Sequence, residues 1–105
     1  MNVEYLEIGT LEELGSEERL LLEIDNHDIL LLQHEGSFLA VENVCSHDGQ
    51  GLDDADVEDG EIICPRHGAR FDLQTGEALT LPAVAGIPAY PVKIENGRVY
   101  LGIED

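Results

Sequence analysis

The sequence has few of the features that mark exported, membrane-spanning or nucleic-acid-binding proteins. It contains two cysteines and no tryptophan, and 5 lysines and arginines stand against 23 aspartates and glutamates, for a net charge of −18. A surface this acidic repels nucleic acid and anionic lipid. No apolar run approaches the roughly 20 residues that cross a bilayer. The N-terminus, Met1–Glu4, has neither the basic flank nor the apolar run of a signal peptide. We therefore expect a soluble, cytoplasmic protein that binds neither nucleic acid nor membrane.

The length of 105 residues is room for one domain, which we expect to span residues 1–105. Since 43% of the residues are hydrophobic, the chain can bury a core and is not disordered by composition. The acidity has two explanations. It could speed encounters with a basic partner surface, or it could serve solubility in a salty cytoplasm, and the sequence leaves both open.

Short apolar or alternating runs between turn residues predict an all-β protein. A capping box at Thr10 and Glu13 predicts one helical turn at residues 11–14. Asn96-Gly97 predicts a type I′ hairpin near the C-terminus. The turn between the second and third strands is expected at Asp25-Asn26-His27. The expected strands cover residues 3–8, 19–24, 28–33, 38–41, 62–63, 69–71, 90–95 and 98–103.

The middle of the chain has a different composition. From Cys45 to Gly60 the residues are small, acidic and glycine-rich, which predicts loop rather than strand or helix. Thr75-Gly76 predicts a tight turn, and three prolines at 82, 88 and 91 keep their segment out of the centre of any sheet. We therefore expect an antiparallel β-sandwich or barrel as a base, with a loop-rich subdomain inserted at about residues 43–81.

Two short motifs hold both cysteines and two of the four histidines. They are Cys45-Ser46-His47 and Cys64-Pro65-Arg66-His67, with sixteen residues between them. Each offers one thiolate and one imidazole, so two such loops face to face would make a four-ligand metal site. A single zinc ion could also take two cysteines and two histidines, although the usual closing pair of histidines on a helix is missing. A disulfide between Cys45 and Cys64 is a third interpretation, but nothing in the sequence indicates an oxidising compartment.

The two motifs and their surroundings resemble the Rieske family, and most of all its soluble ferredoxins that supply electrons to bacterial ring-hydroxylating dioxygenases. The likeness is clearest at residues 45–49 and 64–72 and at Thr75-Gly76, and it covers nearly the whole chain, including the closing segment at 90–92. It implies a Rieske-type fold with the middle segment as the cluster-binding subdomain. It also implies one [2Fe–2S] cluster, with one iron held by Cys45 and Cys64 and the other by His47 and His67.

The resemblance also bears on the reduction potential. Respiratory members of the family carry serine and tyrosine hydroxyls that stabilise the reduced cluster, where this chain has Ala69 and Phe71. They also join the two loops by a disulfide, at positions matched here by Gln50 and Arg66. Nearby acidic residues penalise added negative charge further. We therefore expect a low-potential centre, near the roughly −150 mV lower end of the Rieske range.

The function implied by the resemblance is that of a one-electron carrier with no catalytic residues of its own, and so not an enzyme in isolation. Its expected partners are a flavin-dependent or iron–sulfur ferredoxin reductase and a terminal oxygenase, and it is expected to be a monomer. The alternative is the small subunit of a soluble reductase such as nitrite reductase. The chain leaves no room for the mononuclear iron domain of an oxygenase.

Several other residues near the motifs have open interpretations. Arg66 and Arg70 could orient carboxylates of a partner or could be ordinary solvated arginines. Pro82 could begin a loop that covers the remaining side of the cluster, as it does in the family. His27 and His34 are assigned no role.

Overall fold

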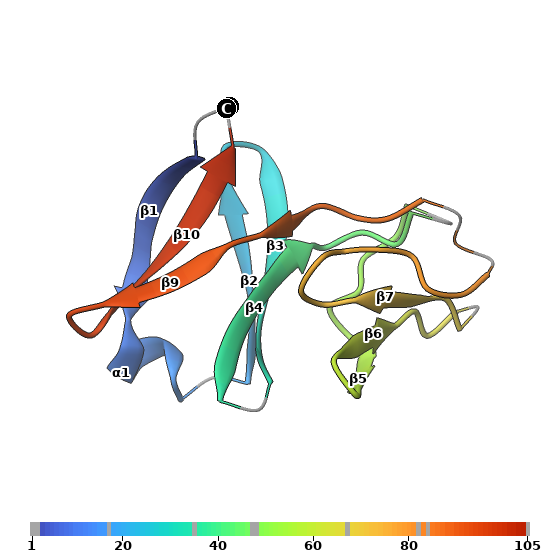
Figure 1. Ribbon diagram of the computed structural model, residues 1–105, viewed down its shortest axis with the longest axis horizontal. Helices are drawn as coiled ribbons and strands as arrows, with labels where there is room; N and C mark the ends of the chain where they lie inside the picture. The colour runs from blue at the N-terminus through green and yellow to red at the C-terminus, as the bar shows by residue number, and fades with distance from the viewer. Residues whose placement is uncertain are drawn as a thin grey trace.

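The computed structural model describes residues 3–16, 18–34, 36–46, 49–66, 68–81, 83 and 85–104. Within these residues the protein is nearly all β-structure, with one short helix, as expected (Figure 1). No helix in this part of the chain is long and apolar enough to cross a membrane. The elements are β1 (Val3–Thr10), α1 (Leu11–Leu14), β2 (Arg19–Ile24), β3 (His27–His34), β4 (Ser37–Glu42), β5 (Asp56–Glu58), β6 (Glu61–Ile63), β7 (Arg70–Asp72), β8 (Ala89–Tyr90), β9 (Val92–Glu95) and β10 (Arg98–Glu104).

The strands form three antiparallel sheets, with the orders β1-β10-β9, β2-β3-β4-β8 and β5-β6-β7. The first sheet joins the two ends of the chain, because β1 pairs with β10. The third sheet comes from the middle of the chain and lies at one end of a molecule that measures 40 × 30 × 19 Å (Figure 1). Strands from both ends of the sequence therefore form the base, and the middle forms a separate lobe beside it.

In the central sheet, β2-β3-β4-β8, the strand β3 is buried on both faces, as its apolar run requires. Ile29 and Leu31 belong to a core cluster shared with Val99 and Leu101 of β10. Leu30 and its neighbour Leu32 point the other way because side chains alternate along a strand, and they belong to a second core cluster that includes both cysteines. One strand thus connects the base core to the core of the lobe.

Tight turns fix the register of the predicted hairpins. Asn96 (φ +53°) and Gly97 (φ +76°) adopt the left-handed conformations of a type I′ turn, which confirms that prediction. The β2–β3 turn is shorter than expected. Asp25 (φ +49°) and Asn26 (φ +67°) make a two-residue turn of the same kind, and His27 is already the first residue of β3. The capping box before α1 is present, with Thr10 as the N-cap.

The prediction of continuous loop from Cys45 to Gly60 is wrong at its end. Residues Asp56–Glu58 form β5, which pairs with β6. Asp59 (φ +53°) and Gly60 (φ +77°) close that hairpin with another pair of left-handed residues. Asp-Gly is a recognised hairpin signal. The strand before it was not predicted because β5 has only one apolar residue, Val57, between two exposed acidic residues.

The expected strand at residues 90–95 is divided at Pro91. Tyr90 pairs with Ala40 at the edge of the central sheet, whereas Val92 pairs with Leu101 in the first sheet. Proline has no N–H to donate to a ladder, so Pro91 lies where the chain passes from one sheet to the other. Because β8 is an edge strand, the expectation that the proline-rich segment stays out of the sheet centre is confirmed for its described residues.

Candidate functional site

The first cysteine loop (residues 45–50) is closed by its own backbone. The Cys45 N–H donates to the Gln50 carbonyl at 2.7 Å, and the Gly49 N–H donates to the Cys45 carbonyl at 2.7 Å. Gly49 has φ +74°, a conformation that residues with a side chain rarely adopt, so glycine permits the reversal here. The loop begins three residues after β4, so its cysteine is held close to the end of the central sheet.

The second cysteine loop (residues 64–69) has the same pattern of hydrogen bonds. The Cys64 N–H donates to the Ala69 carbonyl at 2.8 Å, and the Gly68 N–H donates to the Cys64 carbonyl at 2.9 Å. Gly68 has φ +77°, like its counterpart in the first loop. This loop connects β6 to β7. Ile63, the last residue of β6, pairs with Arg70, the first residue of β7. The two cysteines therefore occupy equivalent positions in two similar loops.

Both cysteines are buried and belong to one core cluster. Cys45 and Cys64 are each 0% exposed, and they are not joined by a disulfide, so the disulfide interpretation is wrong. Phe71 and Leu52 lie in the same cluster. A thiolate among apolar side chains is costly unless a metal binds it. Two buried thiols in equivalent loop positions are therefore a donor set that fits an iron–sulfur group.

The two predicted histidine ligands, His47 and His67, lie outside the described residues. Within the part of the chain that the structure describes, no group of three or more histidine, cysteine or acidic side chains could hold a metal ion. The structure thus shows Cys45 and Cys64 buried in one core cluster. The complete set of four ligands stays a prediction.

Asn43 holds the two ends of the first cysteine loop against the base. Its N–H donates to the Asp28 carbonyl at 2.8 Å, and its side-chain Oδ1 accepts from the Leu52 N–H at 2.5 Å. Its Nδ2 lies 3.5 Å from Oδ1 of Asp53. No motif indicated this role, because Asn43 precedes the first motif and its partners come from β3 and from the segment after the loop.

A third segment packs beside the two loops. The Ser46 hydroxyl donates to the Ala85 carbonyl, which ties residues 85–88 to the first cysteine loop. The Ile87 N–H donates to the Gly76 carbonyl at 2.8 Å, which ties the same segment to the turn after β7. Pro82, which was expected to begin a covering loop, lies outside the described residues. The described continuation of that segment does contact the site.

The positions expected to lower the reduction potential are buried beside the cysteines. Ala69 and Phe71 are both 0% exposed and lie in the core cluster that contains Cys45 and Cys64. Neither side chain has a hydroxyl that could donate to sulfur. Their burial keeps bulk solvent away from both side chains.

The two arginines of the second motif have internal partners. An Arg66 guanidinium nitrogen donates to the Gly51 carbonyl at 3.0 Å, just beyond the first cysteine loop. Arg70 donates to Glu61 at 2.7 Å and lies 3.4 Å from Glu58, and the hydrogen bond to Glu61 is the main cause that raises the pKa of Arg70 above its ordinary value. Both side chains thus have hydrogen-bond acceptors within the chain, and these contacts do not test either interpretation of the two arginines.

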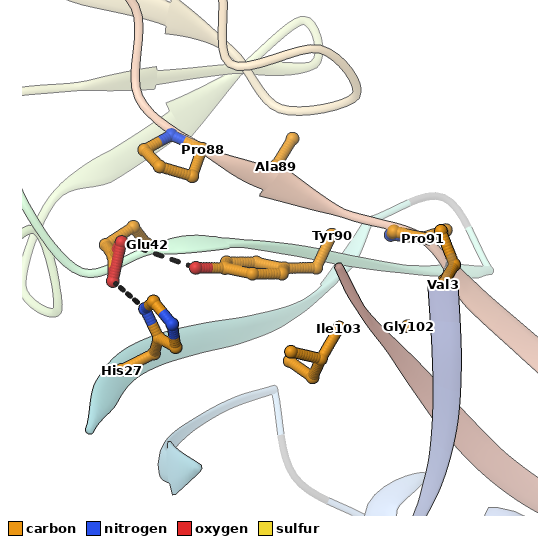
Figure 2. Close-up of a pocket in the computed structure, with 9 residues that line it drawn as sticks. All are labelled: Val3, His27, Glu42, Pro88, Ala89, Tyr90, Pro91, Gly102 and Ile103. Atoms are coloured by element: carbon orange, nitrogen blue, oxygen red, sulfur yellow. Dashed lines mark hydrogen bonds and ion pairs between the residues drawn. The ribbon is translucent and has the colours of Figure 1, made fainter. Parts of the chain in front are cut away.

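A carboxylate at the end of β4 connects three strands near the site. Figure 2 shows Glu42 between His27 of β3 and Tyr90 of β8, with its oxygens 3.3 Å from His27 Nδ1 and 3.3 Å from the Tyr90 hydroxyl. These residues line a cavity of about 230 Å³ together with apolar side chains such as Ile103. Burial, and then the charge of Glu42, raise the pKa of Tyr90 to about 12. Sequence reasoning assigned no role to His27, and only the strand pairing brings it to Glu42.

Comparison with known proteins gives a consistent result. Residues 4–91 match the Rieske [2Fe–2S] domain family. The ferredoxin component of the naphthalene 1,2-dioxygenase/salicylate 5-hydroxylase systems of Ralstonia sp. is 36% identical over 104 residues, which are 99% of this chain and 100% of that protein.

Two solved structures have similar folds. The ferredoxin of carbazole 1,9a-dioxygenase from Nocardioides aromaticivorans IC177 has a TM-score of 0.81 at 28% identity, over 92% of this chain and 95% of that one. The putative NADH-dependent nitrite reductase small subunit from Mycobacterium tuberculosis has a TM-score of 0.83 at 21% identity, over 100% of this chain and 99% of that one. At 21% identity the second likeness concerns the fold alone.

Proposed function

This chain belongs to the Rieske [2Fe–2S] domain family, and we propose that it carries single electrons from a reductase to a terminal oxygenase. Its cofactor is one [2Fe–2S] cluster, which takes up and releases one electron when bound. It is an electron-transfer component rather than an enzyme, as its curated relatives are. The observation that carries the proposal is the pair of buried cysteines in equivalent positions of two loops with the same backbone hydrogen bonds.

The proposed ligands are Cys45 and Cys64 for one iron and His47 and His67 for the other. Support for the sulfur pair comes from the burial of both cysteines and from their shared core cluster. Support for the histidines comes from the motif alone. Two thiolates and two neutral imidazoles leave an oxidised cluster close to neutral, so adding an electron is easier than with four thiolates.

The chain's own residues hold and shield this group. The backbone hydrogen bonds of the two cysteine loops fix where the sulfurs lie. Apolar side chains such as Leu52 and Phe71 keep water from the sulfur side. Because Ala69 and Phe71 offer no hydroxyl, the reduced state gains no hydrogen bond from them, and the potential is proposed to stay near the lower end of the Rieske range.

The partners follow from the relatives. The Ralstonia protein is named as a ferredoxin component of dioxygenase and hydroxylase systems, which supports a terminal oxygenase as the electron acceptor. A flavin-dependent or iron–sulfur reductase is the proposed donor, and the carrier is proposed to act as a cytoplasmic monomer. The whole chain of 1–105 is proposed to be one domain, with residues of about 43–81 as the cluster-binding subdomain.

Low-temperature EPR of the dithionite-reduced holoprotein, with iron and labile-sulfide analysis, tests the proposal. We expect about two irons and two sulfides per chain and a rhombic signal whose average g lies below the free-electron value. A colourless, EPR-silent protein with a single zinc would overturn it. Among the ligand variants, His67→Ala should lose the native signal, whereas His34→Gln, outside the motif, should keep it.

A native pull-down separates the carrier from the reductase subunit. A carrier dissociates from its partners, so the purified protein should be monomeric and reducible by a separate reductase. A stable complex with a large flavin or haem protein would instead indicate a subunit of a reductase such as nitrite reductase. The fold is compatible with either.

A further inference from the structure

We propose that Arg66 is a positioning residue that holds the two cysteine loops together and places a positive charge beside the cluster. Arg66 lies in the second cysteine loop, between the proposed ligands Cys64 and His67. Its acceptor, the Gly51 carbonyl, directly follows the first cysteine loop. The inference rests on the proposed function, because it concerns the geometry of the proposed ligands.

The hydrogen bond that carries the proposal joins segments 15 residues apart in the sequence. An Arg66 guanidinium nitrogen donates to the Gly51 carbonyl at 3.0 Å in a partly buried position. Two backbone hydrogen bonds between described residues close each cysteine loop on itself. Those internal bonds fix the shape of each loop but not the separation between the loops. A bond from one loop to the segment that follows the other does constrain that separation.

The acceptor is itself held in place. Leu52, the next residue, donates its N–H to the Asn43 side chain at 2.5 Å. Gly51 is also closely surrounded, since a Cβ built there would lie 2.8 Å from Asp53 Oδ1 and 3.0 Å from Asn43 Nδ2. Arg66 therefore connects the second cysteine loop to a segment that Asn43 holds against the base.

The charge of Arg66 has a separate consequence. A guanidinium is always protonated in proteins, and this one is partly buried, where charges are screened less than at an exposed position. Reduction adds one negative charge to the cluster. A positive charge beside it favours the reduced state and so raises the potential. In a chain with 23 acidic and 5 basic residues, this contribution opposes the general effect of the surface.

The test compares Arg66→Met and Arg66→Lys with the wild-type holoprotein. Methionine keeps much of the apolar stem of arginine but has neither its charge nor its N–H groups. Arg66→Met should therefore release iron to a chelator roughly tenfold faster than the wild type. A tenfold change corresponds to about 1.4 kcal/mol, the size expected for one hydrogen bond from a charged donor. Its midpoint potential should become more negative. Lysine keeps the charge but has only a compact ammonium group, so Arg66→Lys should restore the potential and only part of the slow release.

The matched control is Arg19→Gln. It removes a guanidinium–carbonyl bond to Asp53, two residues from Gly51, but leaves the bond between the two loops intact. We expect release within about twofold of wild type and an unchanged potential. If Arg66→Met released iron at the wild-type rate, or Arg19→Gln released it as fast as Arg66→Met, the positioning role would be refuted. If Arg66→Met left the potential unchanged, the charge effect would be refuted. Wild-type protein without the rhombic EPR signal would instead refute the proposed function itself.

Discussion

Replacing Gly76 by alanine should destabilise the protein far more than replacing Gly97, although the two glycines have nearly the same backbone conformation. Gly76 has φ +79° and Gly97 has φ +76°. A Cβ at position 97 would meet nothing within 4 Å. A Cβ at position 76 would lie 1.8 Å from the Ile87 carbonyl oxygen. Because that oxygen belongs to the backbone, it cannot rotate away as a flexible side chain could.

The expected sizes follow from these two environments. At position 97 the left-handed conformation costs alanine about 1–2 kcal/mol, and the lower entropy of the unfolded chain returns about 0.4–1 kcal/mol, so Gly97→Ala should lose about 1 kcal/mol. At position 76 the close contact adds about 1–3 kcal/mol, as overpacking does elsewhere. Gly76→Ala should therefore lose about 2–4 kcal/mol. In a domain of this size each kcal/mol lowers Tm by about 4–8 °C.

The assay is denaturant and thermal unfolding of the holoprotein, followed by far-UV circular dichroism and by the visible absorbance of the cluster. Gly76→Ala should also release the cluster sooner. Its clash displaces residues 85–87, and Ser46 of the first cysteine loop donates to Ala85. The prediction is refuted if the free energies of unfolding of the two variants agree within about 0.5 kcal/mol, since differences of that size are not resolved even between independent sites. Ile87 would then not pack on Gly76 as described.

Three further predictions concern the site and its charges. The double variant Ala69→Ser, Phe71→Tyr should raise the midpoint potential, because its new hydroxyls can stabilise the reduced cluster. The expected rise is about 40 mV for each hydrogen bond worth about 1 kcal/mol. An unchanged potential with lower stability would mean that the buried hydroxyls find no acceptor near the cluster. The pKa of Tyr90 is raised from 10.0 to about 12, so its neutral form contributes stability that is complete below about pH 10 and is lost as pH rises through about 12. The unfolding midpoint of Tyr90→Phe should therefore depend less on pH between these values than that of the wild type. Equal pH dependence of the two proteins would contradict the raised pKa of Tyr90. If the acidity steers encounters with a basic partner, the rate of electron exchange should fall about tenfold or more as ionic strength rises from about 0.01 M to about 1 M; a rate independent of salt would favour the solubility explanation.

Local chemistry in the sequence was enough to predict most of the β-structure. The turn at Asn96-Gly97 and the helical turn after Thr10 depend on neighbouring residues only, and both are present. Two of the wrong predictions have a tertiary cause. Pro91 ends one ladder and precedes another because two sheets meet there, and β5 is stabilised by β6 in spite of its acidic residues.

The sequence by itself determined which residues could bind the cofactor, because thiol and imidazole ligands are a matter of residue type and spacing, and those are written in the two motifs. It did not determine how the loops that carry them are held. Only the structure shows that Cys45 and Cys64 occupy equivalent positions in two similar loops. Only tertiary structure brings Arg66 to the segment after the first cysteine loop, and only tertiary structure lets Asn43 hold the two ends of that loop. The physical reason is that the hydrogen bonds of Arg66 and Asn43 join segments that the chain brings together only when its strands pair and its core closes.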